Sequence, residues 1–251
     1  GDEFLVGLTF GLSMLAVGIF VPFLGAITDA SGNRIKFLKY LTLICVIFTA
    51  ATGFAGLWFA LAFAFLANFS YHAALTVYNA ILPKLHVRVG KISGIGVGAG
   101  YLGTILSLAM AFVVLEMMDY SESAIRIIFP LTGAFFLFFS LPIFFILKDK
   151  HFLKKSATRM AAASLYNTLT HVSSFKQMGL LMLSSFLFTN GINTAIIFLY
   201  LYGKEAINLE IKMFIAIYAV FSISAAIASP IFGRFSDKFS PKLGLMAALL
   251  L

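Results

Sequence analysis

Charged side chains are scarce in this chain of 251 residues, where they make up 11% of the composition. A typical soluble domain carries about 25%. Hydrophobic residues make up 61%, and the mean hydropathy is +1.00. A chain with so few polar groups cannot cover its surface in water. The composition therefore excludes most water-soluble proteins and predicts a protein that folds in lipid.

Cysteine and the common catalytic motifs are also nearly absent. Cys45 is the one cysteine, so an intrachain disulfide is excluded. It lies in an apolar segment, which favours a buried thiol. The sequence contains no H-E-x-x-H, G-x-S-x-G or G-x-x-x-x-G-K-[ST] motif. His86, His151 and His171 lie in connecting segments and lack the spacing of metal ligands. We predict no enzymatic activity, no ATP-driven pumping, and neither a metal nor a cofactor.

Long apolar segments, by contrast, fill most of the chain. Seven of them are long enough to cross a bilayer as helices, which takes about 20 residues, and an eighth begins near residue 243. Because lipid offers no partner to unpaired backbone groups, each segment is predicted to be a helix. The predicted fold class is therefore an all-α, polytopic bundle of transmembrane helices. The seven segments are 4–27, 36–54, 57–82, 93–117, 127–147, 177–201 and 213–232.

The basic residues are distributed unevenly among the loops. Alternate loops hold 15 of the 18 Lys and Arg residues, whereas the other loops hold only Arg126, Lys204 and Lys212. Basic loops of membrane proteins face the cytoplasm, so we expect a multi-pass integral protein, of the cytoplasmic (inner) membrane if the source is prokaryotic. The net charge of +8 then reflects topology and contact with membrane lipids. It predicts no nucleic-acid partner, and no obligate protein partner is evident.

A motif at the end of the first segment recurs 208 residues later, at the end of the seventh. Both copies have the pattern P-x-x-G-x-x-x-D-x-x-[GS]-x-[RK]. Two copies at corresponding places predict two related helical halves. The members are Pro22, Gly25, Asp29, Gly32 and Arg34 in the first copy, and Pro230, Gly233, Asp237, Ser240 and Lys242 in the second.

The residue types of this motif suit a corner between two helices. Glycine allows a neighbouring helix to approach closely, and aspartate can cap the next helix or face its positive end. We expect Arg34 and Lys242 to pair with Asp29 and Asp237. The alternative is a plain basic loop with a chance aspartate. Seven residues are predicted to form a conformational latch: Gly25, Asp29, Gly32, Arg34, Gly233, Asp237 and Lys242.

The segments 25–36 and 233–238 resemble a loop signature of the major facilitator superfamily, which lies between family spans two and three, and its weaker echo between spans eight and nine. The resemblance covers the whole chain and implies a bundle of two pseudo-symmetric six-span halves. Residues 1–147 would hold family spans two to six, 148–176 a cytoplasmic basic linker, and 177–251 spans seven to nine, the last incomplete. One span would then precede Gly1, and three to four would follow Leu251.

Three further segments resemble the vacuole-effluxer-like branch of that superfamily, whose yeast members export amino acids from the vacuole. They are Y-N-A-I-L-P at 78–83, the glycine-rich stretch 93–103, and T-N-G-I-N-T at 189–194. At the position of Asn190, members of that branch more often have an aspartate, so this chain departs from the branch there. The resemblance implies efflux of an amino acid or another small metabolite.

A polar stripe runs along the segment 57–82. Four polar side chains follow helical spacings of four, four and three residues, with a tyrosine beside them. One of them, His72, is the only acidic or basic side chain well inside a complete segment, where polar groups are costly. We expect the stripe to bind substrate and His72 to couple a proton; the alternative is a hydrogen-bond network that packs helices. The candidates are Asn68, Tyr71, His72, Thr76 and Asn79.

The segment 177–201 carries a second polar group, formed by Thr189, Asn190 and Asn193. Gly191 lies among them and favours a locally loosened helix, a feature that exposes backbone groups to substrate in many transporters. We expect these three side chains to contact substrate, with polar helix packing again as the alternative.

Glycine is frequent in the segment 93–117, at Gly94, Gly96, Gly98, Gly100 and Gly103, and Gly96 and Gly100 form G-x-x-x-G. No strand precedes these glycines, which makes a nucleotide-binding loop a poor interpretation. They predict close packing against a neighbouring helix, on a surface that also permits sliding.

These features favour secondary active transport of a small solute by alternating access, in which two halves rock about a site near the bilayer midplane. A fold does not determine a function. A non-transporting scaffold or receptor on the same fold is therefore the alternative.

Overall fold

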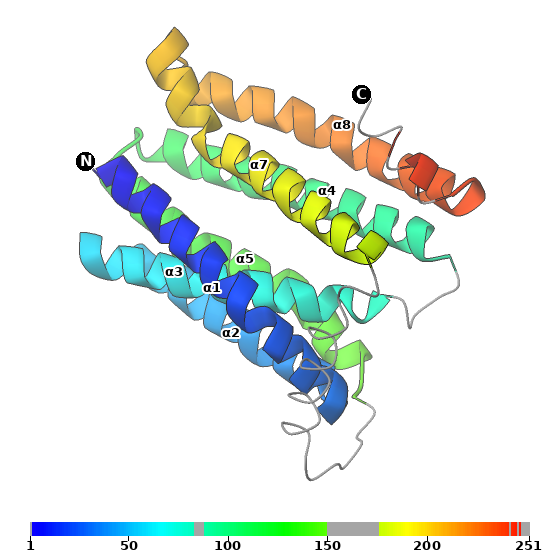
Figure 1. Cartoon of the computed structure of the whole chain (residues 1–251). Helices are drawn as coiled ribbons and strands as arrows, with labels where there is room; N and C mark the ends of the chain where they lie inside the picture. The colour runs from blue at the N-terminus through cyan, green and yellow to red at the C-terminus, as the bar shows by residue number, and fades with distance from the viewer. Residues whose placement is uncertain (1, 83–87, 150–175, 241, 245, 247–251) are drawn as a thin grey trace.

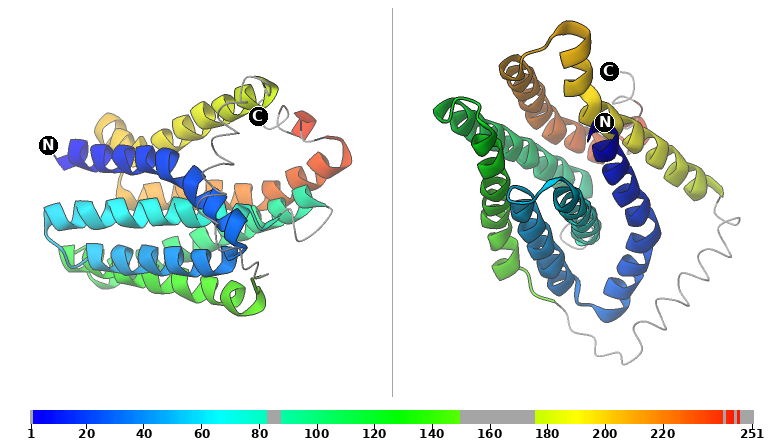
Figure 2. Two further views of the ribbon diagram at one scale, coloured as in Figure 1. Left: turned by 60° about the horizontal axis from the view of Figure 1, so that its bottom comes forward. Right: turned by 90° about the vertical axis from the view of Figure 1, so that its left-hand side faces the viewer.

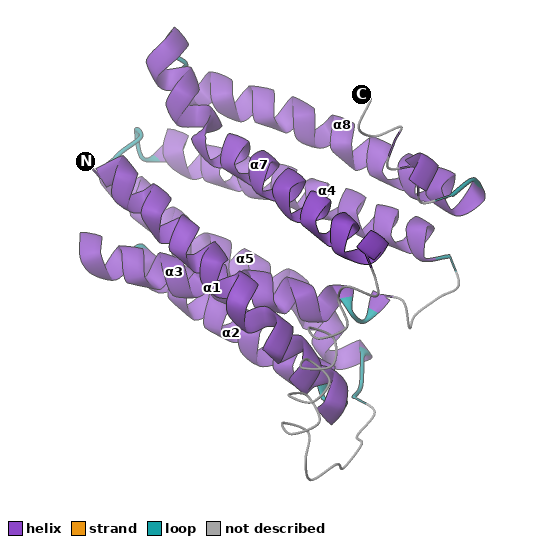
Figure 3. Cartoon of the chain, viewed as in Figure 1, coloured by secondary structure: helices purple, strands orange, loops and turns teal. Residues whose placement is uncertain are grey.

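The computed structural model describes residues 2–82, 88–149, 176–240, 242–244 and 246 (Figure 1). The long elements among these residues are all α-helices joined by short loops (Figure 3), which confirms the predicted fold class. In chain order they are α1 (Asp2–Ser31), α2 (Arg34–Thr52), α3 (Leu57–Asn79), α4 (Val89–Met117), α5 (Glu122–Ile146), α7 (Lys176–Ile207) and α8 (Ile211–Lys238).

Six of the described helices are long and apolar enough to cross a membrane, namely α1 to α5 and α8. Each corresponds to one of the predicted segments. The predicted segment 177–201 falls within α7, which is helical but is not one of the six. The segment expected from residue 243 lies mostly outside the described residues.

The loops and helix termini gather at two opposite ends of the bundle. Gly32 closes α1 with a φ of 70°, a left-handed conformation that favours glycine, and its N–H donates to the carbonyl of Thr28 at 3.1 Å. Asp149, which follows α5 and bonds to the start of α2, and Asp237, in the last turn of α8, lie at this same end, which we call the basic end; Figure 1 shows these helix ends. The opposite end, which we call the far end, holds the α2–α3 turn at Gly56 and the α4–α5 turn at Tyr120.

The main hydrophobic core lies among α1, α2 and α3, toward the basic end. Small residues on α3 allow this close packing, and Ala73 is completely buried. The end of α5 covers the core through Ile143, Phe144 and Leu147. The buried residues are Val21, Ile35, Leu38, Leu41, Ala73, Ala74, Val77 and Ile81.

The helices α4 and α8 form a second packing unit, in which they lie antiparallel along each other (Figure 1). The right-hand view of Figure 2 shows this pair to one side of the group formed by α1, α2 and α3. α7 approaches α1 where the ring of Phe198 lies against Gly7. The two members of the α4–α8 pair come from the two predicted halves of the chain.

Candidate functional site

The carboxylate of Asp237 joins α8 to the first turn of α4 at the basic end. It accepts hydrogen bonds from the backbone N–H of Gly90 at 2.9 Å and of Lys91 at 2.7 Å. The first N–H groups of a helix have no partner within the helix and carry partial positive charge. The N-cap residue of α4, Arg88, makes no side-chain capping bond, and its first turn holds no acidic residue. Asp237 therefore supplies the cap that α4 lacks.

This contact corrects one expectation. Among the described residues, Asp237 forms no ion pair with Lys242. The uncapped helix end offers the carboxylate two directed N–H donors, whereas a lysine beyond the end of α8 offers a single charge on a flexible chain.

Closely packed glycines continue the contact along α4 and α8. A Cβ added at Gly94 would lie 2.5 Å from the carbonyl oxygen of Ser229, and one added at Gly98 would lie 2.9 Å from that of Ala226. Gly233, in the repeated motif, packs directly against the backbone of Gly90. We call this surface the glycine seam; it consists of Gly90, Gly94, Gly98, Ala226, Ser229 and Gly233.

The glycine seam contains only some of the glycines expected to pack closely. A Cβ at Gly100 would meet nothing within 4 Å among the described residues, and one at Gly96 would meet only the hydroxyl of Tyr78, at 3.7 Å. Gly96 and Gly100 lie on the opposite face of α4 because two residues turn a helix by about 200°. The residues of α4 that approach α8 closely are Gly90, Gly94 and Gly98, which follow one another at intervals of four.

The first copy of the motif has a different set of contacts. The guanidinium of Arg34 pairs with Asp29, as expected, and also donates to the carbonyl of Ala80 at the end of α3 at 2.5 Å. Gly32 makes the corner described above. A Cβ at Gly25 would meet no atom within 4 Å in the described part of the chain, so the close approach expected there is absent from it. The latch role of both copies stays a prediction.

Asp149 is a contact residue that the sequence did not single out. Its carboxylate accepts from the N–H of Ile35 at 2.7 Å and of Lys36 at 3.0 Å, at the start of α2. The N-cap of α2, Asn33, makes no side-chain capping bond, and the first turn holds no acidic residue. The sequence signal for this contact was the absence of an acidic residue from the first turn of α2. That signal does not identify the partner, because Asp149 lies 114 residues from Ile35.

The predicted polar stripe of α3 is divided among several environments. The amide of Asn68 donates to the buried hydroxyl of Ser13 on α1 at 2.5 Å, a bond that packs two helices. Thr76 donates to the backbone carbonyl of His72 at 3.0 Å. His72 is half-buried, and Thr76 and Asn79 are exposed; their role as substrate contacts stays a prediction.

Tyr71 is the aromatic candidate of α3. Its ring contacts the ring of His72 edge-on at 5.1 Å, and it lines a cavity of about 430 Å³ among α2, α3 and α5. Tyr78 lines the same cavity. Tyr71 is 42% exposed, and its role in binding substrate stays a prediction.

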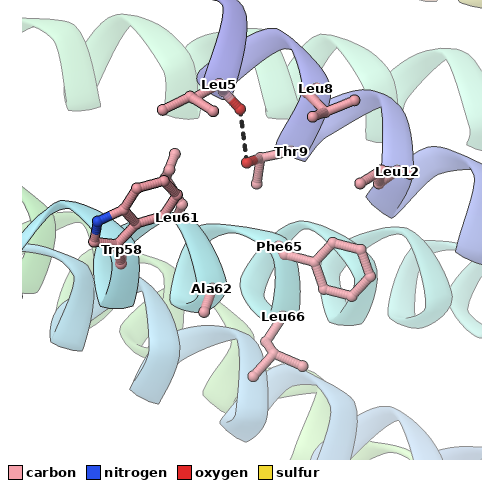
Figure 4. Close-up of a pocket in the computed structure, with 9 residues that line it drawn as sticks. All are labelled: Leu5, Leu8, Thr9, Leu12, Trp58, Leu61, Ala62, Phe65 and Leu66. Carbon is pink, nitrogen blue, oxygen red and sulfur yellow. Dashed lines mark hydrogen bonds between the residues drawn. The ribbon is translucent and has the colours of Figure 1, made fainter. Parts of the chain in front are cut away.

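A second, more apolar pocket of about 490 Å³ lies between α1 and α3 toward the far end (Figure 4). Its only hydroxyl group, on Thr9, donates to the carbonyl of Leu5 at 2.8 Å. None of the expected substrate residues lines it. The lining residues are Leu5, Leu8, Thr9 and Leu12 of α1 and Trp58, Leu61, Ala62, Phe65 and Leu66 of α3.

The candidates of α7 are described only in part. The amide of Asn190 donates to the carbonyl of Phe186 at 2.8 Å, one turn earlier in the same helix. The side chains of Thr189 and Asn193 lie outside the described residues. The helix is continuous through Gly191, so the loosening expected there is absent from the structure.

Comparison with known families decides what kind of bundle this is. A model of the Major Facilitator Superfamily matches residues 1–251. The chain belongs to this superfamily. Major facilitator proteins are membrane transporters, and the six apolar helices agree with an integral membrane protein. In the described part of the chain, no group of three or more His, Cys, Asp or Glu residues could hold a metal ion.

Two curated relatives extend this comparison. The chain is 24% identical, over 264 residues, to "Uncharacterized MFS-type transporter YxiO" of Bacillus subtilis (strain 168), covering 98% of the chain and 60% of the relative. It is 22% identical, over 241 residues, to an "Uncharacterized protein" of Aquifex aeolicus (strain VF5), covering 95% of the chain and 58% of the relative. No solved structure matches. The chain thus spans about 60% of the length of these superfamily members.

The superfamily assignment leaves the finer divisions of the chain as predictions. The boundaries of the halves, 1–147 and 177–251, belong to these, as does the membership of the vacuole-effluxer-like branch. Of the linker 148–176, residues 150–175 lie outside the described part. Both copies of the repeated motif lie at the basic end, where α1 and α8 end (Figure 1).

Proposed function

We propose that this major facilitator protein is a secondary active transporter that moves a small solute by alternating access. The observation that supports this most is the bond from Asp237 to the start of α4. α4 belongs to the predicted first half and α8 to the second, so the bond crosses between halves. A charged contact that closes one end of such a boundary is suited to distinguish two conformations of the protein.

The chemistry of the contact supports a latch that can open. Asp237 is exposed, so water can replace the two N–H groups when the halves separate. The glycine seam beside it places backbone against backbone with no long side chains to interlock, so the surfaces are able to part or slide. The first motif copy, with Asp29 and Arg34, would form the corresponding latch of the other half.

The solute would bind near His72, Thr76 and Asn79, whose side chains are uncharged or weakly basic. This favours a small polar solute, such as an amino acid or another metabolite, with His72 coupling a proton. We further propose that the basic end faces the cytoplasm, that the loops there contact anionic lipids, and that transport is efflux.

The proposal is tested by solute flux in proteoliposomes made with the intact protein. A panel of labelled amino acids and small metabolites would be offered with and without a pH gradient. Asp237→Asn keeps the size of the side chain but removes its charge and one strong acceptor, and we expect transport of the identified solute to fall several-fold. Membrane insertion and yield should stay unchanged.

Asp149→Asn is the matched control, because Asp149, at the start of the predicted linker, caps α2 in the same way without joining the two predicted halves. It should lower thermal stability slightly and leave the transport rate near that of the wild type. Equal transport by wild type and Asp237→Asn would remove the latch role. Failure of the wild type to move any solute would instead favour the scaffold or receptor.

A further inference from the structure

A cluster of three side chains joins α4 and α8 at the far end, opposite Asp237. The ammonium of Lys212, in the first turn of α8, lies 2.7 Å from the Glu116 carboxylate in the last turn of α4. The hydroxyl of Tyr120 donates to the same carboxylate at 2.6 Å. The ammonium also lies 5.0 Å from the centre of the Tyr120 ring, within the range of a cation–π contact.

The backbone after α4 is bent to complete this cluster. Asp119 and Tyr120 have φ values of 48° and 54°, a left-handed conformation that non-glycine residues seldom adopt. The N–H of Tyr120 donates to the carbonyl of Leu115 at 2.9 Å, which folds the chain back over the end of α4. Two consecutive residues of this kind are costly unless a contact compensates for them. The contacts of Tyr120 with Glu116 and Lys212 provide that compensation.

The electrostatics of the cluster favour its hydrogen bond and allow its ion pair to open. Desolvation, and then the hydrogen bond to Glu116, raise the pKa of the Tyr120 hydroxyl above its ordinary value. The phenol is therefore protonated at neutral pH and remains a donor. The side chains of Lys212 and Glu116 are 52% and 41% exposed, so the ion pair can be broken and rehydrated without stranding a buried charge.

The cluster differs in kind from the neighbouring ion pair of α5. Arg126 and Glu122 lie 2.9 Å apart, but they are four residues apart on one helix and stabilise only that helix. Lys212 and Glu116 lie on helices from the two predicted halves. The far end thus offers one pair that spans the boundary and one that does not.

We propose that Glu116, Tyr120 and Lys212 form a far-end clasp that gates this side of the transporter. The inference deepens the proposed alternating access and rests on it. In this conformation the α4–α8 pair is held at both ends, by Asp237 and by the clasp. Opening the far end requires the Lys212 ammonium to leave both Glu116 and the Tyr120 ring. Breaking the clasp therefore increases the population that is open at the far end.

The experiment measures the distance between the halves by double electron–electron resonance in liposomes. The intact protein would carry Cys45→Ala, with spin labels on Gly56→Cys at the α2–α3 turn and Ala206→Cys near the end of α7. Both label sites are exposed at the far end, and a Cβ at Gly56 meets nothing within 4 Å of the described structure. Two distance populations would report the closed and open far end.

Glu116→Gln and Lys212→Gln each remove the ion pair, and we expect each to raise the open-to-closed ratio by roughly two- to fivefold, the range of a partly exposed ion pair. Tyr120→Phe keeps the ring and loses the hydroxyl, so its shift should be smaller and in the same direction. The charge-reversed double variant, Glu116→Lys with Lys212→Glu, should return the ratio toward that of the wild type.

Glu122→Gln is the matched control and should leave the ratio unchanged. Rescue by the double variant excludes misfolding as the cause of the single-variant shifts. The clasp is overturned if the two single variants keep the wild-type ratio, or if Glu122→Gln shifts it equally. A single, invariant distance in the wild type would contradict alternating access itself, so the two proposals fail separately.

Discussion

Asp237 and Asp149 cap helices to which they do not belong. Each carboxylate accepts from two successive backbone N–H groups, at the start of α4 and of α2 respectively. Neither helix has a capping side chain of its own. A carboxylate at a helix N-terminus is stabilised both by directed hydrogen bonds and by the helix dipole. These aspartates thus connect separate helices where an ordinary N-cap would only end one.

His72 is proposed both to contact the solute and to couple a proton. His72→Ala is expected to flatten the dependence of transport on pH between about 5 and 8, because imidazole is the side chain whose charge ordinarily changes there. The measurement is uptake of the identified solute against pH in proteoliposomes.

Asn79→Ala serves as the control for this experiment. Asn79 lies on the same polar stripe of α3 but does not titrate. Its replacement should lower the rate at every pH and keep the shape of the profile. A wild-type pH profile in His72→Ala would show that protons are coupled elsewhere.

At the scale of elements, α4 presents two different faces. The face with Gly94 and Gly98 is buried against α8, whereas Gly96 and Gly100 lie on a face that no described helix covers closely. Sequence reasoning found the abundance of glycine and its use in close packing. It did not decide which face of α4 meets the neighbouring helix, because both faces carry a G-x-x-x-G pattern, at 94–98 and at 96–100.

The two faces predict opposite effects of the same substitution. Gly94→Ala places a methyl group 2.5 Å from the carbonyl oxygen of Ser229, so α4 and α8 must shift apart. We expect a loss of stability of about 1–3 kcal/mol, as for other overpacked sites. Thermal unfolding of the purified protein in detergent provides the measurement.

Gly96→Ala is the matched variant on the other face. Its methyl group would lie 3.7 Å from the hydroxyl of Tyr78, an ordinary van der Waals distance. Since alanine favours a helix by up to about 1 kcal/mol over glycine, stability should be unchanged or higher. A lower melting temperature for Gly96→Ala than for Gly94→Ala would contradict the assignment of the glycine seam to α8.

At the scale of the whole molecule, the α4–α8 pair is the main connection between the two predicted halves. Its contacts run from the Asp237 bond at the basic end to Glu116 and Lys212 at the far end. The hydrophobic core, by contrast, lies within the first half, among α1, α2 and α3. This division leaves the boundary between halves with polar and glycine contacts that can be exchanged.

The orientation of the bundle is open to a direct test. In a protein with Cys45→Ala, single cysteines would replace Gly56 at the far end and Lys36 at the basic end, both of which are exposed. A membrane-impermeant maleimide should label Gly56→Cys in intact cells and Lys36→Cys only after lysis, because the basic loops favour the cytoplasm. The reverse labelling pattern would invert the proposed topology and the direction of both gates.

The sequence by itself determined that the protein folds in lipid, that its elements are helices, and that it contains an internal repeat. Composition and segment length led to membrane helices, and the recurrence of Asp29 at Asp237 led to the superfamily and to the prediction of two related halves. These properties depend on local composition and on spacing along the chain, which any folded form must respect.

Only the tertiary structure decided which groups meet. Helical periodicity places Asn68 and His72 on one stripe, but it does not indicate that Ser13 on α1 takes the amide of Asn68. Gly90 and Asp237 bind across 147 residues, a separation at which no local pattern specifies the partner. The partner of a polar side chain depends on which helix covers its face, and that follows from the packing of the whole bundle.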